Sequence, residues 1–225
     1  GGLVLTGWAF DIPALKSVLP GYFAMKANLA LGFILAGISL WILNQDAPLP
    51  SWRRMGRACA LATAAIGGVT LLEYLLNWNA GIDQILFREP PGAVGTFSPG
   101  RMAFTAALNL LIVGIAILLL ETIKGAWLAQ FLALLSGLVA LQASFNYFSG
   151  SRDFSGVGAY TQMAMHAGLT FVILSAGILY ARPRWGVTAV VTSGCVGGIT
   201  ARNLLPAVLV IPFVMGWMGL EGRRL

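Results

Sequence analysis

The chain has 225 residues, of which 58% are hydrophobic and 10% are charged, and its mean hydropathy is +0.82. This balance excludes an ordinary soluble domain, because apolar runs such as 108–120 and 131–141 would need a larger core than a chain of this length can form. The net charge of +6 comes from basic residues in short loops between apolar runs, which indicates a membrane protein rather than one that binds nucleic acid.

Along the chain, residues 1–21 form an apolar segment too short to span, which we interpret as an outer-face or truncated helix segment because the chain starts Gly-Gly without Met and looks like an excerpt. Counting about 17 to 25 residues per span predicts a helical bundle over 22–220, followed by the start of a cytoplasmic linker at 221–225. The seven expected helices are 22–43, 55–78, 102–121, 125–148, 163–181, 186–201 and 204–220. Arg202 and Asn203 divide the last two, which leaves open one kinked helix or a re-entrant pair.

Three of these spans open with one pattern: Met, a polar residue three positions on, Leu at six, Phe or Leu at eight, and Gly or Ser at twelve. The pattern starts at Met25, Met102 and Met163. It predicts an all-α membrane bundle of about seven transmembrane helices, built from three repeated helical hairpins plus a last helix.

The distribution of Lys and Arg predicts which end faces the cytoplasm. One face carries eight, mostly without acidic neighbours, and they include the expected basic anchors: Arg53, Arg54, Arg57, Lys124, Arg182, Arg184, Arg223 and Arg224. The loops of the other face hold Asp11, Asp83, Glu89 and Asp153. They also carry six basic residues: Lys16, Lys26, Arg88, Arg101, Arg152 and Arg202. We therefore expect a cytoplasmic C-terminus, with loops 79–100 and 149–162 outside.

Small residues within the spans predict close helix contacts at Gly37, Gly114 and the pair Gly194 and Gly198. Cys59 and Cys195 fall in apolar spans without an obvious partner, so neither a disulfide nor a metal site is predicted. We find no phosphate loop, no Ser-His-Asp set and no paired carboxylates, so no catalytic residue is assigned and the chain itself is not expected to be an enzyme.

Five residues near the outer ends of the spans are candidates for binding a ligand or receiving a signal: Glu73, Asp83, His166, Asn28 and Thr105. Glu73 lies near the outer end of its span, where an ionisable group either has a function or sits at interface depth and reaches water. The only histidine, His166, occupies the repeat position held by Asn28 and Thr105, which favours a helix-start or interhelical hydrogen bond over proton sensing.

Asp83 belongs to the amphipathic segment 79–88, which we expect on the outer membrane surface either as a ligand-binding lid or as a plain connector. Most tryptophans fall near predicted span ends, as interface anchors do. No cofactor is predicted from these patterns, and whether lipid, quinone or pigment binds stays open. A retinal protein is excluded because no lysine lies in the last three spans.

Four stretches resemble the membrane input region of bacterial sensor histidine kinases and diguanylate cyclases: 21–33, Gly81-Ile-Asp-Gln-Ile-Leu-Phe87, Arg101-Met102 and 197–206. The resemblance runs from about Trp8 to Trp217. It implies a module in the bacterial inner membrane that passes a stimulus to a cytoplasmic kinase or cyclase domain, here absent, and that forms a homodimer or binds other membrane subunits. An accessory or scaffold subunit of a larger membrane complex is the alternative, and a small-molecule carrier is a third interpretation.

Overall fold

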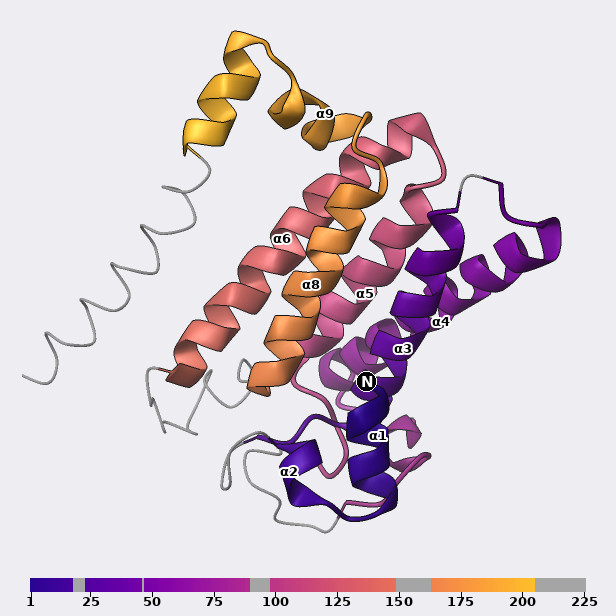
Figure 1. Cartoon of the computed structure of the whole chain (residues 1–225). Helices are drawn as coiled ribbons and strands as arrows, with labels where there is room; N and C mark the ends of the chain where they lie inside the picture. Colours follow the sequence, from indigo (N-terminus) through magenta and orange to yellow (C-terminus); the bar gives the residue numbers. More distant parts are fainter. Residues whose placement is uncertain (18–22, 46, 90–97, 149–162, 205–225) are drawn as a thin grey trace, which may run out of the picture.

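The computed structural model describes residues 1–17, 23–45, 47–89, 98–148 and 163–204, and all elements in these ranges are helical. Five long helices form the bundle: α3 (Ala27–Leu43), α4 (Pro50–Leu75), α5 (Phe104–Leu119), α6 (Ile123–Phe148) and α8 (Met165–Ala181). They match five of the seven predicted helices to within a few residues. Figure 1 shows that α3, α5 and α8 run in one direction and α4 and α6 in the other.

Two of these helices are long and apolar enough to cross a membrane, namely α4 and residues Ile123–Ser144 of α6. A third candidate span results if α8 is counted together with α9 (Gly186–Thr192), to which it is joined by a bend of 77°. The apolar helices α3 and α5 are shorter, at 17 and 16 residues, or about 25 Å of helix. The described part is thus a helical bundle with membrane-spanning capacity, and the number of seven spans stays a prediction.

The three repeat motifs begin their helices alike. Met25, Met102 and Met163 are buried, with exposed fractions of 2%, 1% and 4%, and each lies two residues before the first residue of α3, α5 or α8. The intervening residue is extended in every case, with ψ between 140° and 151°. The methionine therefore packs into the core just before the chain turns into the helix.

Further along the motifs, position eight also reaches the core. Phe33, Leu110 and Phe171 are all buried, and the rings of Phe33 and Phe171 meet edge to face at 4.7 Å. Such aromatic contacts add stabilisation beyond the apolar area they bury. The motif thus encodes core packing of α3 against α8, while the hairpin repeat itself remains an interpretation of the sequence.

Glycines bring α4 and α5 into close contact. A Cβ added to Gly67 of α4 would lie 2.5 Å from the carbonyl oxygen of Ala107, and one added to Gly114 of α5 would lie 2.6 Å from the backbone nitrogen of Ala64. Backbones can approach this closely only where side chains are absent. Gly114 therefore lies where two helices touch.

The other predicted packing glycines behave differently. A Cβ added to Gly37 or Gly194 would meet no atom within 4 Å in the described part of the chain, so neither makes a close helix contact there. Gly198 lies against the carbonyl oxygens of Val190 and Ser193, which belong to its own segment. Its small size serves a local fold and not the packing of two spans.

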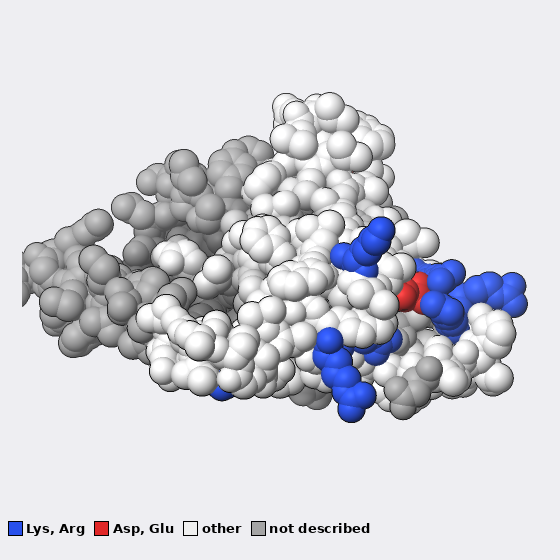
Figure 2. Space-filling view, turned by 90° about the horizontal axis from the view of Figure 1, so that it is seen from above, with Lys and Arg blue, Asp and Glu red and all other residues white. Residues whose placement is uncertain are grey.

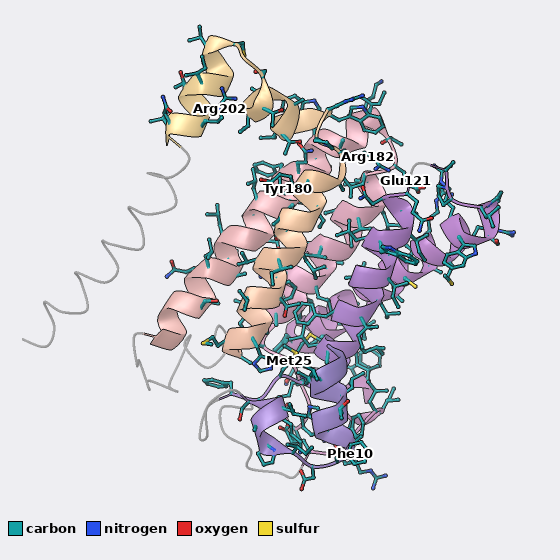
Figure 3. All side chains as sticks on the ribbon, in the orientation of Figure 1. Phe10, Met25, Glu121, Tyr180, Arg182 and Arg202 are labelled. Atoms are coloured by element: carbon teal, nitrogen blue, oxygen red, sulfur yellow. The ribbon has the colours of Figure 1, made fainter. Side chains whose placement is uncertain are left out.

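The predicted helix 186–201 is not continuous, which corrects the sequence interpretation. The helix α9 ends at Thr192, residues 193–195 are non-helical, and residues 196–204 are helical again. The guanidinium of Arg202 donates to the carbonyl oxygens of Val191 and Ser193, which folds the second piece back onto the first. Figures 1 and 3 place this segment, with Arg202, at the same end of the bundle as Arg182, although Arg202 had been assigned to the opposite face.

The predicted span 204–220 and the linker 221–225, with Arg223 and Arg224, lie outside the described residues apart from Leu204. The N-terminal segment 1–21 contains two short helices in its described part, α1 (Gly2–Ala9) and α2 (Pro13–Lys16). Figure 1 shows both at the end of the bundle where α3 starts. We call this end the outer end and the opposite one the inner end, following the predicted orientation.

Candidate functional site

Five charged side chains gather at the outer end of the bundle, and all are buried. They come from four separate segments: the start of α3, the end of α4, the loop around the 3₁₀ helix η1 (Ile82–Gln84), and the loop before α5. We call them the outer charge cluster: Lys26, Glu73, Asp83, Glu89 and Arg101. Their exposed fractions are 9% or less. Buried charges lower the stability of the folded protein unless they are paired. The stability of this end of the bundle therefore depends on how the five charges pair.

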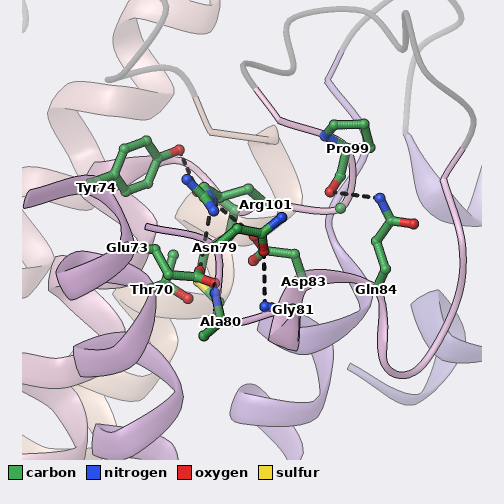
Figure 4. A network of polar contacts seen from close by, with 12 residues as sticks. Thr70, Glu73, Tyr74, Asn79, Ala80, Gly81, Asp83, Gln84, Pro99 and Arg101 are labelled. Carbon is green, nitrogen blue, oxygen red and sulfur yellow. Dashed lines mark hydrogen bonds and ion pairs between the residues drawn. The ribbon is translucent and has the colours of Figure 1, made fainter. Parts of the chain in front are cut away.

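Arg101 is the centre of the cluster, as Figure 4 shows. Its Nε–H donates to Asp83 at 2.8 Å and lies 3.6 Å from Oε2 of Glu73. Its Nη2 donates to the carbonyl oxygen of Trp78 at 3.3 Å. The guanidinium also stacks 5.4 Å from the ring centroid of Tyr74, whose hydroxyl donates to the carbonyl oxygen of Met102. One arginine thus joins the end of α4, the η1 segment and the start of α5.

Lys26 and Glu89 form the second pair. The Lys26 ammonium lies 2.6 Å from both carboxylate oxygens of Glu89, and one of these oxygens also accepts the backbone N–H of Gly100. Because Lys26 directly precedes α3, this pair fixes the start of α3 to the loop that contains Glu89. The side chain of Asn28 extends the contact by donating to Asp83 at 3.5 Å.

Gly100 allows the loop before α5 to approach the η1 segment. Its φ is +78°, a left-handed conformation that favours glycine, and an added Cβ would clash with the carbonyl oxygen of Asp83. The absence of a side chain here positions both the Gly100 N–H for Glu89 and the neighbouring Arg101 for Asp83.

Glu73 is fully buried, which excludes the interpretation that it simply reaches water at interface depth. Its Oε1 accepts the backbone N–H of Ala80 at 2.8 Å, whereas Oε2 has no hydrogen-bond partner among the described residues. The cluster holds three carboxylates and two cations. Oε2 of Glu73 lies 3.6 Å from Nε of Arg101, so Glu73 and Asp83 share this one guanidinium.

The five residues predicted from the sequence are only partly brought together. Glu73, Asp83 and Asn28 meet in or beside the cluster. Thr105 lies in the first turn of α5, close in sequence to Arg101. His166 lies in the first turn of α8 at the same end, but neither ring nitrogen has a hydrogen-bond partner in the described ranges. The helix-start or interhelical hydrogen bond expected for His166 is therefore not found there.

Three members of the cluster were counted in the sequence only as outer-face charges: Lys26, Glu89 and Arg101. Their positions carried a usable signal, since Lys26 directly follows motif Met25 and Arg101 directly precedes motif Met102. The segment 79–88 contributes buried Asp83 to the cluster, while Ile85 and Leu86 are exposed by 73% and 43%, so its expected place on the outer membrane surface stays a prediction.

The short helices α1 and α2 also contact this end. Trp8 of α1 donates from its indole nitrogen to the carbonyl oxygen of Met25 at 2.9 Å and stacks on Phe87 at 6.1 Å. The Lys16 ammonium lies 4.6 Å from the centroid of the Trp8 ring. The predicted interface tryptophan is therefore a packing residue that joins the N-terminal segment to the start of α3.

The charged side chains at the inner end are paired and exposed in a different way from those of the outer charge cluster. The loop residue Glu121 accepts hydrogen bonds from Arg53 and Arg57 at 2.5 Å each, and both arginines are about half exposed, at 49% and 47%. Partial burial acts to raise the pKa of Glu121, but hydrogen bonds and attraction from Arg57 and Arg53 together lower it below its usual value. Figure 2, seen from above this end, shows blue basic side chains spread over the surface and red acidic atoms in one place.

Arg182 joins two helices at the inner end. It donates from Nη2 to the carbonyl oxygen of Leu43 at 2.8 Å and from Nη1 to Oδ1 of Asn44 at 3.1 Å. The C-terminal ends of α3 and α8 are thereby tied together, and cations are favoured at such ends. Figure 3 labels Arg182 and Glu121 at this end of the bundle.

Gln130 of α6, which the sequence analysis did not consider, holds the bend between α8 and α9. Its side chain is fully buried, donates to the carbonyl oxygen of Trp185 at 3.0 Å and accepts the backbone N–H of Thr188 at 3.1 Å. A buried amide stabilises such a turn because it replaces water as the partner of backbone groups.

In the ranges described, no group of three or more His, Cys, Asp or Glu side chains is arranged to hold a metal ion. Cys59 and Cys195 are free thiols. The outer charge cluster is a site of buried charge pairing. Comparisons with protein-family models, with curated proteins and with solved structures find no match for this chain.

Proposed function

We propose that the chain is the sensory and anchoring module of a bacterial inner-membrane signalling protein, and that the outer charge cluster receives the stimulus. The observation that supports this proposal is the burial of five charges from four segments at one end of the bundle, as the pair of Lys26 with Glu89 and the group of Arg101, Asp83 and Glu73. A network used only for stability would gain little from buried ions, since apolar residues often serve as well. A network that changes which charges are paired when a stimulus arrives needs buried ions.

The resemblance to sensor input regions supplies the finer part of the proposal. It comprises seven transmembrane helices from three repeated hairpins plus a last helix, a C-terminus in the cytoplasm, and a kinase or cyclase output domain beyond it. The chain itself is proposed to have no enzymatic activity. A homodimer would bring two output domains together.

The helix α3 offers a physical route for the signal. Lys26, the residue before α3, is paired with Glu89 of the cluster, and Asn44, the residue after α3, accepts a hydrogen bond from Arg182 at the end of α8. A displacement of α3 would therefore act on both ends of the bundle. At the inner end it would reach the bend that Gln130 holds between α8 and α9.

Proton uptake at Glu73 is the stimulus that this geometry accommodates most simply. With Glu73 ionised, Arg101 is shared by two carboxylates, and with Glu73 protonated it pairs with Asp83 alone. A stimulus shifts a population only if it binds two packings with different affinity. Protonation meets this requirement because it changes the charge balance of one packing and not the other.

The test uses the intact parent protein and the activity of its output domain. Glu73→Gln mimics the protonated carboxyl and is expected to fix the output in one state at every external pH. Glu121→Gln, the matched control, removes a carboxylate at the inner end and should leave the response to pH intact. A pH response of the Glu73→Gln protein equal to that of the unmodified protein would reject Glu73 as the sensing group.

A scaffold or accessory subunit is the second candidate, favoured by an exposed apolar stripe on α6. Its residues recur at helical spacing and are between 37% and 60% exposed: Trp127, Leu128, Phe131, Leu134, Leu135 and Leu138. Either lipid or a partner subunit can cover such a face. Mass spectrometry of the native assembly, purified in mild detergent, separates the two: a chain that continues into a signalling domain supports the sensor, and a short chain that travels with other membrane subunits supports the scaffold.

A further inference from the structure

A cavity at the inner end lies beside the junction of α8 and α9, far from the outer charge cluster. Its volume is about 590 Å³, and its lining combines two arginines and a glutamine with apolar side chains: Gln45, Ala181, Arg182, Pro183, Arg184 and Trp185. Ligand sites in proteins commonly have volumes of about 300 to 1,000 Å³. The cavity is thus large enough for a small charged group.

Two arginines give this cavity a positive character. Arg182 is held in place by Leu43 and Asn44, and its hydrogen bonds use Nη1 and Nη2 while Nε–H has no partner in the described part of the chain. Arg184 is exposed and makes no hydrogen bond or ion pair with any described residue. One arginine is therefore preorganised and the other is available, which suits recognition of a phosphate group.

Among the described residues, neither of these arginines has an acidic partner. The nearest described carboxylate in the inner loops, Glu121, is occupied by Arg53 and Arg57. In the sequence, six cations of the inner loops 44–57, 120–124 and 182–185 stand against two carboxylates, Glu121 and Asp46. The field at this end therefore attracts anions.

Aromatic side chains place the cavity at the depth of lipid headgroups. Trp185 lines it, and the Arg182 guanidinium lies 5.8 Å from the centroid of the Trp185 ring. Trp41, Trp52 and Tyr180 at the same end are exposed by 61%, 42% and 77%. Such rings lie at membrane–water interfaces, and basic pockets between helices on the cytoplasmic side suit lipid phosphates.

We infer that this cavity binds the phosphodiester headgroup of an anionic phospholipid. Arg182 and Arg184 would donate to the phosphate oxygens, and Trp185 would pack against the glycerol region. The lipid would cover the bend between α8 and α9, so its binding would stabilise that junction. This inference is independent of the proposed sensory function.

The experiment measures phospholipid binding to the full chain in mild detergent by native mass spectrometry, with phosphatidylglycerol and phosphatidylcholine as probes. Arg184→Ala is expected to weaken phosphatidylglycerol binding about fivefold, because it removes a direct charge-assisted contact with the phosphate, and Arg184→Lys should keep most of the affinity. Arg54→Ala is the matched control, because Arg54 is an exposed arginine of the same end that does not line the cavity. It should change binding by less than about twofold.

Two results would overturn the inference. Equal losses in Arg184→Ala and Arg54→Ala would mean that surface charge attracts the lipid without a defined site. Displacement of phosphatidylglycerol by inorganic phosphate would mean that the cavity takes a free anion and not a lipid. Retention of phosphatidylglycerol in excess phosphate, with a loss confined to Arg184→Ala, supports the headgroup site.

Discussion

The two ends of this bundle use charged residues in opposite ways. At the outer end the charges are buried and paired with one another, as in Lys26 with Glu89 and Arg101 with Asp83. At the inner end the arginines are exposed, and Arg53 and Arg57 share one carboxylate, Glu121. The comparison teaches that a count of cations per end underestimates the asymmetry, because Lys26 and Arg101 are neutralised inside the protein whereas Arg53 and Arg57 are about half exposed.

The largest effect is expected from breaking the outer network at its centre. Arg101→Met leaves Asp83 and Glu73 buried without their cation, and should lower the free energy of unfolding by about 3 to 5 kcal/mol. Tryptophan fluorescence during unfolding in mixed micelles measures the change. Arg54→Met, an exposed arginine of the inner end, should cost less than about 0.5 kcal/mol. Equal losses in both variants would contradict the contrast between the ends.

The second largest effect is expected at Gly100, whose backbone conformation lets the loop before α5 approach Asp83. Gly100→Ala forces a left-handed conformation on alanine, which costs about 1 to 3 kcal/mol, and adds a clash with the Asp83 carbonyl oxygen. Gly81→Ala is the matched control, since Gly81 has a similar φ of +76° but open space around the added Cβ. Unfolding in micelles should show a larger loss for Gly100→Ala. Identical losses would show that the close approach to Asp83 is unimportant.

A smaller effect is expected at the inner end, where the key buried group is a neutral amide. Gln130→Leu leaves the N–H of Thr188 without its partner, at a cost of about 1 to 3 kcal/mol, while the carbonyl oxygen of Trp185 keeps the Thr188 hydroxyl. Ser136→Ala on the same helix removes a buried hydroxyl that has no hydrogen-bond partner in the described ranges, so it should be nearly neutral. Faster proteolysis near α9 in Gln130→Leu alone would locate the loss at the bend.

The smallest effect is the pH dependence of the exposed pairs. Because the folded pKa of Glu121 lies below its usual value of 4.5, its pairing stabilises the protein above pH 4.5, and this contribution is lost as the pH falls through the folded pKa. Thermal unfolding of the unmodified protein and of Glu121→Gln should therefore converge in acid. Salt should reduce the difference at neutral pH, since Arg53 and Arg57 are about half exposed. A difference that persists in acid would contradict the assignment.

The sequence predicted five helices to within a few residues because long apolar runs bounded by charges and prolines indicate helices, whereas the count of seven spans stays a prediction. Glu73 was a candidate because an ionisable group within a span is uncommon, Asn28 because it holds the polar position of the repeat, and Asp83 because it belongs to an amphipathic segment. The sequence did not reveal that Arg101 pairs with Asp83 or Lys26 with Glu89, since these contacts join residues 18 and 63 positions apart. Contacts of this range depend on how the helices pack.

The break after α9 escaped prediction for a related reason. Residues 186–201 are apolar enough to suggest a span, and only the folded structure shows Arg202 bonded to the carbonyl oxygens of Val191 and Ser193. Gln130 was overlooked because a single glutamine in an apolar helix gives no indication of its partners. Its role depends on a turn more than 50 residues away in the sequence.

A pair of double-mutant cycles tests the central claim most directly. One cycle combines Lys26→Met with Glu89→Gln at the outer end, and the other combines Arg57→Ala with Glu121→Ala at the inner end, both read as free energies of unfolding in micelles. The account predicts a coupling of about 2 to 3 kcal/mol for the buried pair and about 0.2 to 1 kcal/mol for the exposed pair. Couplings of equal size at the two ends would contradict it.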